Sequence, residues 1–345
     1  MGQNRRQFLK GAGAAACAIA GAGAAAALAG QLPAKAEIAP TPNRPRGMAR
    51  GLILMTLRRA GQYRLAAKTP WGILDVGEAG KFLRMHAPAT MDDLLQNEDG
   101  PSVNAVVEAA GKSKAAQKLF FREDRLEYGP VVTRPEKILC LGLNYRRYVT
   151  QSGAAIPKQP VLFNKYNNSL NHHWGTIKLP ADVKKFDHEV ELVIVMGKEA
   201  KNVKEADALS CVAGYCTGND FSARDLQLEA DGGQWMIGKT LDQFAPLGPY
   251  MVTADQVNPD NLMIECRVNG ETRQSSNTRD FIFNSRQIIS YISHYITLKP
   301  GDIIFTGTPE GAIQSKPKDR QVWLKRGDKV ACSVEKLSEL RFELV

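Results

Sequence analysis

Short apolar runs separated by glycine, proline and asparagine dominate the sequence from residue 137 to the end. Runs of this length that are rich in valine, isoleucine and leucine and bounded by turn residues are typical of β-strands. We expect strands at 138–142, 161–163, 189–196, 262–268 and 302–306. Few long helical patterns interrupt them, so residues 131–345 are predicted to form a predominantly β domain.

Residues 51–130 have a mixed pattern, which predicts a small N-terminal α+β module. Strand patterns at 52–57, 63–67 and 72–76 precede a helical periodicity over 103–116. Few polar groups gather here, so we expect a structural or oligomerising role. Residues 37–50, rich in proline and arginine, are predicted to form an extended linker. The fold class expected for the chain is therefore α+β, predominantly β.

The first 36 residues have the pattern of an export signal. Arg5 and Arg6 precede Phe8, and the stretch 11–29 consists mainly of alanine and glycine without any charge. This pattern resembles a twin-arginine signal peptide, which predicts a periplasmic protein that crosses the membrane already folded. Alanine and glycine are too weakly hydrophobic for a stable membrane span. A lipid anchor on Cys17 is the alternative interpretation.

The charge and the cysteines change this picture little. The formal net charge is +9, but the four basic residues before the first acidic one account for almost half of it. No basic run is interleaved with aromatic residues, so a nucleic-acid partner is not expected. The five cysteines after the signal form no C-x-x-C pair and lie in apolar surroundings, which predicts buried free thiols.

Three carboxylates alternate along the chain at the start of the strongest apolar run. In a strand, Asp187, Glu189 and Glu191 would share one face, while His188 would point to the other. Carboxylates held together beside apolar residues repel one another unless a cation neutralises them. Oxygen ligands favour Mg²⁺ or Mn²⁺ over zinc, and Ca²⁺ is also acceptable. The alternative is an edge strand with a solvated acidic face.

A second polar cluster follows at 218–227. We expect a helix to begin near Ser222, with Asp220 at its entry and with Arg224 and Gln227 one turn apart on one face. Asp220 would then complete a site of three carboxylates, and Arg224 and Gln227 would hold the oxygens of a substrate. The alternative is a capped helix that carries a surface arginine.

Several ordered motifs resemble those of the fumarylacetoacetate hydrolase family. They are Asn144-Tyr145, Glu189-x-Glu191, Asn219-Asp220-x-Ser222-x-Arg224-Asp225-x-Gln227, Trp235-x-x-Gly238-Lys239, Pro246-x-Gly248-Pro249 and Thr306-Gly307-Thr308-Pro309. The resemblance runs from about residue 51 to the end and looks closest to the domain-containing members with a small N-terminal module. It implies a roll-like β catalytic domain that forms a homodimer.

The resemblance also implies roles for the matching residues. The implied metal ligands are Glu189, Glu191 and Asp220. The implied catalytic and substrate-binding residues are Lys239, Arg224, Gln227, Tyr145 and Thr308. A 2-oxo acid would chelate Mg²⁺ or Mn²⁺ through its carboxylate and keto oxygens, while Lys239 would stabilise the enolate oxygen as charge develops.

Two segments depart from the family pattern. Hydrolases and decarboxylases of the family usually carry a histidine and, three residues later, a glutamate that together activate water. Tyr148 and Gln151 stand at these positions. An ordinary tyrosine has a pKa near ~10 and glutamine does not ionise, so this pair is a weak substitute for the dyad. His172 or His173 would supply a replacement base only if their loop folds over the metal.

These features predict a divalent-metal-dependent enzyme that acts through an enolate on a small 2-oxo or β-diketo acid. Hydrolysis of a C–C bond in an acylpyruvate-like compound is the favoured reaction. Without the dyad, the alternative is tautomerisation, isomerisation, decarboxylation or a lyase reaction on an oxaloacetate-like acid, because enolate stabilisation suffices for these. An alternative of another class is a periplasmic binding protein that keeps the metal pocket without catalysis.

Overall fold

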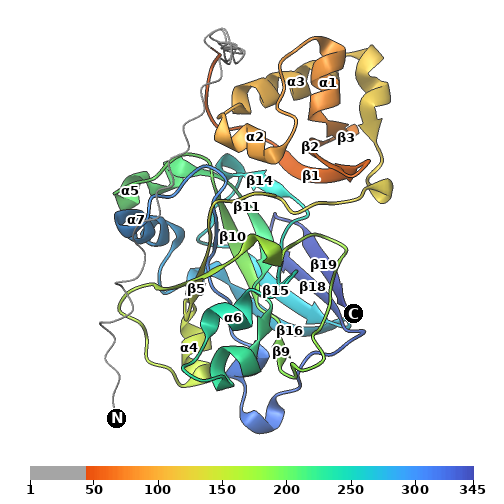
Figure 1. The fold of residues 1–345 in the computed structure, drawn as a ribbon. Coiled ribbons are helices and arrows are strands. Elements are labelled where there is room, and N and C mark those ends of the chain that lie inside the picture. The colour runs from red at the N-terminus through yellow and green to blue at the C-terminus, as the bar shows by residue number, and fades with distance from the viewer. Residues whose placement is uncertain (1–43) are drawn as a thin grey trace, which may run out of the picture. The chain divides into compact units, whose positions relative to one another are not determined.

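A computed structural model describes residues 44–345 of the chain (Figure 1). The predicted signal at 1–36 and the first half of the predicted linker, residues 37–43, lie outside the described residues. Pro45–Val345 form one compact unit. Gly47, in the described end of the linker, exchanges backbone hydrogen bonds with Glu98 and Gly100, so this end lies against the neighbouring helices. Within residues 44–345, no helix combines the length and the apolar character needed to cross a membrane.

The secondary structure alternates many short strands with a few helices. The N-terminal part contains β1 (Ile53–Arg59), β2 (Gln62–Thr69), β3 (Gly72–Asp75), α1 (Val76–Leu83), α2 (Met91–Gln96), α3 (Gly100–Lys112) and β4 (Phe120–Phe121). The middle part contains β5 (Ile138–Gly142), α4 (Arg146–Ser152), β6 (Val161–Lys165), β7 (Leu170–Asn171), β8 (Gly175–Ile177), β9 (Phe186–Asp187), β10 (Val190–Met196), α5 (Glu205–Ala208), β11 (Val212–Asn219) and β12 (Ser222–Ala223). The C-terminal part contains α6 (Trp235–Lys239), β13 (Ala245–Pro246), β14 (Met251–Thr253), β15 (Met263–Val268), β16 (Glu271–Asn277), α7 (Ser285–Tyr295), β17 (Ile303–Phe305), β18 (Lys329–Val334) and β19 (Glu339–Leu344).

The largest sheet has ten strands in the order β4-β3-β2-β1-β14-β11-β10-β17-β5-β6. β10 pairs with β11 on one side and with β17 on the other, and all seven of its residues are buried. A run of valine, isoleucine and leucine suits this central place, because both faces of the strand are covered. The interpretation of residues 187–191 as a solvated edge strand is therefore wrong.

The N-terminal strands extend this sheet rather than forming a separate one. β1 pairs with β2 along its whole length and with β14 through Ile53 and Leu54. Helices α1 and α3 pack over these strands, and α3 buries its apolar face through Val103, Val106 and Ala110 (Figure 1). The predicted helix begins earlier than expected, with proline in its first turn, and ends at Lys112 before a 3₁₀ segment.

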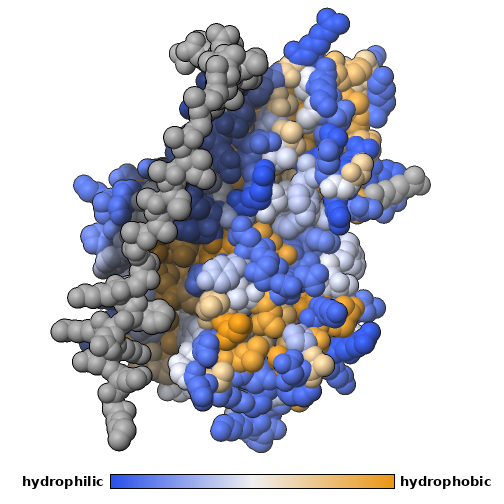
Figure 2. All heavy atoms as spheres, in the orientation of Figure 1, coloured by the Kyte–Doolittle hydropathy of each residue, from blue (hydrophilic) through white to orange (hydrophobic). Residues whose placement is uncertain are grey.

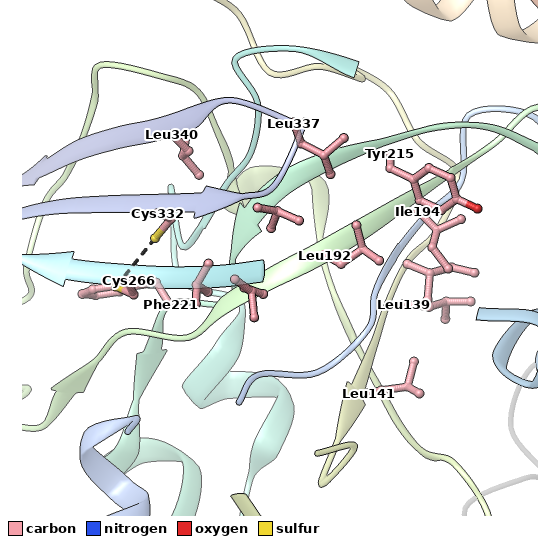
Figure 3. Close-up of a cluster of buried hydrophobic side chains, with 14 of the residues drawn as sticks. Leu139, Leu141, Leu192, Ile194, Tyr215, Phe221, Cys266, Cys332, Leu337 and Leu340 are labelled. Carbon is pink, nitrogen blue, oxygen red and sulfur yellow. Dashed lines mark hydrogen bonds between the residues drawn. The ribbon is translucent and has the colours of Figure 1, made fainter. Parts of the chain in front are cut away.

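A second sheet, with the strand order β16-β15-β18-β19-β8, packs against the centre of the first. Burial alternates along β15, β18 and β19, so one face of each strand meets the core and the other meets solvent. Figure 3 shows this core, in which Cys266 and Cys332 lie opposite each other among leucine side chains. The five cysteines of the described chain are free and buried, as predicted. The predominantly β fold is thus confirmed.

The face drawn in Figure 2 is mainly hydrophilic. Apolar patches lie in both its upper and its lower parts, and the lower part contains α4 and α6 in Figure 1. Met236 and Ile237 of α6 and Leu228 before it are among the exposed apolar side chains. These residues follow the polar cluster at 218–227 in the sequence.

Candidate active site

Adjacent strands bring the predicted metal ligands together. Glu189 directly precedes β10 and Glu191 lies on it, while Asp220 follows the end of β11. β10 and β11 are antiparallel with Glu191 opposite Gly218, and the Asp220 N–H donates to the Glu189 carbonyl at 2.9 Å. One carboxylate oxygen of each residue lies within 4.8 Å of the others, and all three side chains are buried.

Asp187 lies outside this group, although it shares the alternation with Glu189 and Glu191. Its carboxylate accepts hydrogen bonds from Arg224 Nε at 2.9 Å and from the backbone N–H groups of Ile313 and Gln314 at 2.8 and 3.0 Å. Burial raises the pKa of this carboxyl, but the charge of Arg224, the neighbouring His188 and the two backbone N–H groups together outweigh burial, so the pKa lies below its ordinary value. Asp187 therefore orients Arg224. His188 points away towards Gln274, as expected.

Three buried cations surround the carboxylates. Arg224 pairs with Glu189 and donates to the Gln227 side-chain oxygen at 2.7 Å. Lys239 pairs with Glu189 and donates to Asp220 at 2.7 Å. Lys165, which the sequence reasoning missed, donates to Asp220 at 2.5 Å and to the Phe221 carbonyl at 3.2 Å. A lysine shortly after an apolar run is typical of an ordinary strand end, so nothing in the local sequence indicates that Lys165 contacts the carboxylates.

The charge balance of this site fits a divalent cation. Four buried carboxylates face three buried cations, which leaves one negative charge. Within residues 44–345, Glu191 has no cationic partner, and its carboxylate accepts a hydrogen bond only from the Gly307 N–H at 2.7 Å. Burial, and then the charges of Asp220 and Glu189, raise its pKa well above the ordinary value. A dication held by Glu189, Glu191 and Asp220 would relieve this repulsion and leave one positive charge for an anionic substrate.

The segment that follows Asp220 does not begin the predicted helix. Ser222 and Ala223 form β12, which pairs with Asp187 and Phe186 of β9. A single π-helical turn, Asp225–Glu229, comes next. Tertiary pairing with β9 overrides the local helical pattern here, and π-helical turns are frequent at functional sites. Arg224 and Gln227 still meet, but through this wider turn.

A pocket of about 200 Å³ opens above the carboxylates. Its polar lining residues are Tyr148, Ser152, Glu189, Glu191, Arg224, Gln227, Lys239, Thr308 and Gln314. Its walls are mainly apolar and include Phe163 and Trp235, whose rings meet edge to face at 5.5 Å. The Lys239 ammonium lies 5.2 Å from the centre of the Phe163 ring. The pocket therefore combines a charged floor with partly apolar walls.

Helix α4 places Tyr148 in the pocket and Gln151 outside it. No residue of the described chain makes a hydrogen bond with the Tyr148 hydroxyl, and burial raises its pKa to about 12. The Gln151 side-chain oxygen accepts from the Gly311 N–H at 3.0 Å and from the Ser315 hydroxyl at 2.8 Å. Gln151 thus fastens α4 to the segment 311–315 and does not line the site where its family counterpart would act.

Three other candidate residues also lie away from the pocket lining. The Tyr145 ring is buried against Phe281, and burial raises its pKa. His172 and His173 lie in another part of the structure, where His173 accepts from the Arg341 N–H at 3.1 Å. Burial lowers the pKa of His173 to about 4. Neither the substrate role expected of Tyr145 nor a replacement base from the histidine pair is supported by these positions.

Thr308 lines the pocket, but its hydroxyl is already engaged. The hydroxyl donates to the Val190 carbonyl at 2.9 Å and accepts from the Gln274 side-chain amide at 2.9 Å. It therefore has no free proton for a substrate carboxylate in this arrangement.

The fold and the site define a class of protein: a β-rich enzyme fold with buried carboxylates that are arranged as oxygen ligands beneath a small pocket. The family model described as fumarylacetoacetate (FAA) hydrolase C-terminal matches residues 137–345. The chain belongs to the fumarylacetoacetate hydrolase family.

Individual relatives show the range of chemistry in this family. The human mitochondrial oxaloacetate tautomerase FAHD2A is 39% identical over 271 residues, which cover 76% of this chain and 84% of that protein. The structure of 5-carboxymethyl-2-hydroxymuconate delta-isomerase from Mycobacterium smegmatis is 35% identical, with a TM-score of 0.58 over 65% of this chain and 82% of that one. Fumarylpyruvate hydrolase from Pseudomonas aeruginosa, solved with Mn²⁺ and pyruvate, is 29% identical, with a TM-score of 0.57 over 63% and 96%.

Proposed function

We propose that the chain catalyses the metal-assisted keto–enol tautomerisation of a small 2-oxo acid of the oxaloacetate type. The composition of the pocket carries this proposal. It contains the groups that stabilise an enolate, but its lining includes no histidine and no carboxylate other than Glu189 and Glu191. Tautomerisation needs proton transfer and enolate stabilisation without an activated water. The similarity to oxaloacetate tautomerases over most of the chain supports the same reaction.

The chain's own residues would bind and polarise the substrate. A divalent ion on Glu189, Glu191 and Asp220 would supply Lewis-acid stabilisation of the enolate oxygen. Lys239 places a second positive charge on the same floor. Burial alone would lower its pKa, but Asp220 and Glu189 outweigh burial and hold the pKa above its ordinary value, so the ammonium stays charged. Arg224 is fixed by Asp187 and offsets the charge of the substrate.

Tyr148 is the residue that we assign to proton transfer. Its hydroxyl has no hydrogen-bond partner in the described part of the chain, and its raised pKa keeps it protonated at neutral pH, so it is a proton donor rather than a base. In the direction from enol to ketone, it would give a proton to the carbon next to the keto group. The enol hydroxyl loses one proton in the same reaction, and water returns it to the tyrosine, so no proton is gained or lost overall.

Hydrolysis of an acylpyruvate-like C–C bond is the second candidate. The similarity to a fumarylpyruvate hydrolase favours it, and the apolar walls would accept an acyl group. It ranks second because attack by water needs a general base, and the family's histidine and glutamate are replaced by Tyr148 and Gln151. In the structure, Gln151 contacts the segment 311–315 instead.

The experiment is to follow the enol absorbance of oxaloacetate and of acylpyruvates with Mg²⁺ or Mn²⁺, and to analyse the products. Loss of enol absorbance above the buffer rate, with the carbon skeleton intact, is expected with oxaloacetate and not with Glu191→Gln. Cleavage of acylpyruvates would favour the second candidate. Binding of these acids, seen as thermal stabilisation without any turnover, would replace both with the binding-protein alternative.

Export and assembly complete the proposal. The twin-arginine pattern at 1–36 supports a periplasmic location, and membership in the family supports a homodimer. Fractionation of cells that produce the full chain, compared with Arg5→Lys/Arg6→Lys, tests the first. Sedimentation equilibrium tests the second, since a single species at the monomer mass of 37.8 kDa, or less after signal removal, would exclude the dimer.

A further inference from the structure

Gln274, on β16, lies behind the pocket, and its buried side chain makes four hydrogen bonds. Its oxygen accepts from the Val190 N–H at 3.1 Å and from His188 Nδ1 at 3.0 Å. Its nitrogen donates to the Thr308 hydroxyl and to the Pro309 carbonyl, both at 2.9 Å. The side chain thus joins the start of β10 to the turn 306–309, and it is almost completely buried.

The backbone fixes the orientation of this amide. The Val190 N–H can only donate and the Pro309 carbonyl can only accept, so the amide oxygen faces β10 and the amide nitrogen faces the turn. It follows that His188 carries its proton on Nδ1. The His188 Nε2 has no hydrogen-bond partner among residues 44–345. Neither end of the amide can be exchanged without losing a buried hydrogen bond.

A β-bulge directs Gln274 towards the turn. Cys266 pairs with Gln274 while Arg267 pairs with Thr272, which leaves Arg273 as an extra residue in β16. Bulges of this kind re-aim neighbouring side chains and are frequent near active sites. Gly311 packs against the bulge with φ +95°, and a Cβ there would lie 2.2 Å from the Arg273 carbonyl oxygen. The bulge and the segment after the turn therefore fit closely.

We propose that Gln274 is a positioning residue that holds the turn 306–309 in the geometry needed for metal and substrate binding. The same turn supplies the Gly307 N–H, which is the hydrogen bond that Glu191 receives from the protein. It also carries Thr308, whose hydroxyl Gln274 keeps directed at the Val190 carbonyl. Residues behind a metal ligand orient it, and their loss commonly weakens metal binding by roughly 10–100-fold.

Calorimetric titration of the purified chain with Mn²⁺ tests this role without any substrate. Gln274→Met keeps the length of the side chain and removes its hydrogen bonds, so we expect the Mn²⁺ dissociation constant to rise at least roughly tenfold. Asn171→Leu is the matched control, because Asn171 is also buried and its amide holds the Thr176 and Gln243 carbonyls outside the pocket lining. It should lose stability but keep the wild-type Mn²⁺ affinity.

A second variant keeps the test decisive if Gln274→Met does not fold. Gln274→Glu retains the oxygen that faces Val190 and His188 but, when ionised, cannot donate to Thr308 or Pro309, and we expect weaker Mn²⁺ binding from it as well. Wild-type affinity in either folded variant would overturn the proposal, as would an equal loss of affinity in Asn171→Leu. These outcomes do not depend on the reaction assigned above.

A kinetic test rests on the proposed function. If Gln274 acts through Thr308, then Gln274→Met and Thr308→Val should each raise KM for the 2-oxo acid several-fold with a smaller change in kcat. The KM of the double variant should be no higher than that of the single variant with the higher KM, because the effects of coupled residues are not additive. Multiplying effects would overturn action through Thr308. An inactive wild-type chain that binds Mn²⁺ would count against the tautomerase proposal alone.

Discussion

Replacement of Lys165 by methionine isolates the contribution of the cation that the sequence reasoning missed. The Lys165 ammonium lies 2.5 Å from Asp220 Oδ1, and both side chains are buried. At an effective dielectric constant of about 20, two charges at this distance attract each other by about 7 kcal/mol. The cost of burying the lysine offsets part of this, and removal of one partner of a buried pair typically costs about 3–5 kcal/mol. Lys239 still pairs with Asp220 in the variant, so the lower end of this range, about 3 kcal/mol, is expected.

The expected result has two parts. Without metal, Lys165→Met should lower the melting temperature by about 6 °C, since a chain of this size shifts by roughly 2 °C per kcal/mol. Saturating Mn²⁺ should raise the melting temperature of the variant by more than it raises that of the wild type, because one of the cations that compete with the metal for Asp220 is gone. A tenfold gain in affinity for Mn²⁺ would add about 1.4 kcal/mol to the free energy of unfolding, which raises the melting temperature by about 3 °C.

Scanning calorimetry with and without Mn²⁺ measures both parts. Lys112→Met is the control, since Lys112 pairs with Glu108 on an exposed helix face and its loss should leave the melting temperature and the Mn²⁺ effect unchanged. Wild-type stability of metal-free Lys165→Met would refute the assigned ion-pair energy. A smaller Mn²⁺ effect than in the wild type would refute the charge balance described for the site.

Three further predictions concern the pocket. Glu191→Gln should raise the melting temperature of the metal-free chain, because it removes a buried carboxylate that pairs with no cation among residues 44–345, and should abolish stabilisation by Mn²⁺; a fall in the metal-free value would contradict this. Tyr148→Phe should slow tautomerisation by roughly 10²-fold or more without changing Mn²⁺ affinity. With the pKa of Tyr148 at about 12, its proton is present at all lower pH values, so the wild-type rate should show no loss of this donor between pH 6 and 10, whereas a histidine-like transition near ~6.5 would contradict the assignment. Gly238→Ala should destabilise the chain by about 1–3 kcal/mol and raise KM, because its Cβ would lie 2.4 Å from the Gln227 Cβ; unchanged calorimetric and kinetic values would show that the contact relaxes freely.

The sequence was sufficient for the central strand and for the carboxylates that it positions. Apart from Glu191, the run from Val190 to Met196 is apolar and rich in β-branched residues, and such runs indicate a strand with both faces covered. The alternation of Glu189 and Glu191 predicted a shared direction, and the structure brings Asp220 to them. Local periodicity is enough for the strand and for Glu189 and Glu191, because these depend on one short segment. The place of Asp220 followed from a second motif, and Asp187, on the same alternation, binds Arg224 instead.

The parts that could not be predicted depend on contacts between distant segments. Ser222 begins a short strand rather than a helix because β9, more than thirty residues earlier, pairs with it. The burial of Lys165 depends on Asp220, and the use of Gln151 as a fastening residue depends on Gly311 and Ser315. Nothing in the immediate sequence around Lys165 or Gln151 distinguishes these arrangements from an ordinary strand end or an exposed helix.

The pairing of β1 with β14 has a consequence for the solubility of a fragment that contains the catalytic part alone. The family model begins at residue 137, but Ile53 and Leu54 of β1 cover one side of β14. A fragment that lacks residues 45–130 would leave the backbone donors and acceptors of β14 open at the margin of the large sheet. Open strand margins invite pairing with other molecules and aggregation. The N-terminal strands therefore cover this edge of β14 against pairing with strands of other molecules, and a shortened chain that is meant to stay soluble should retain them.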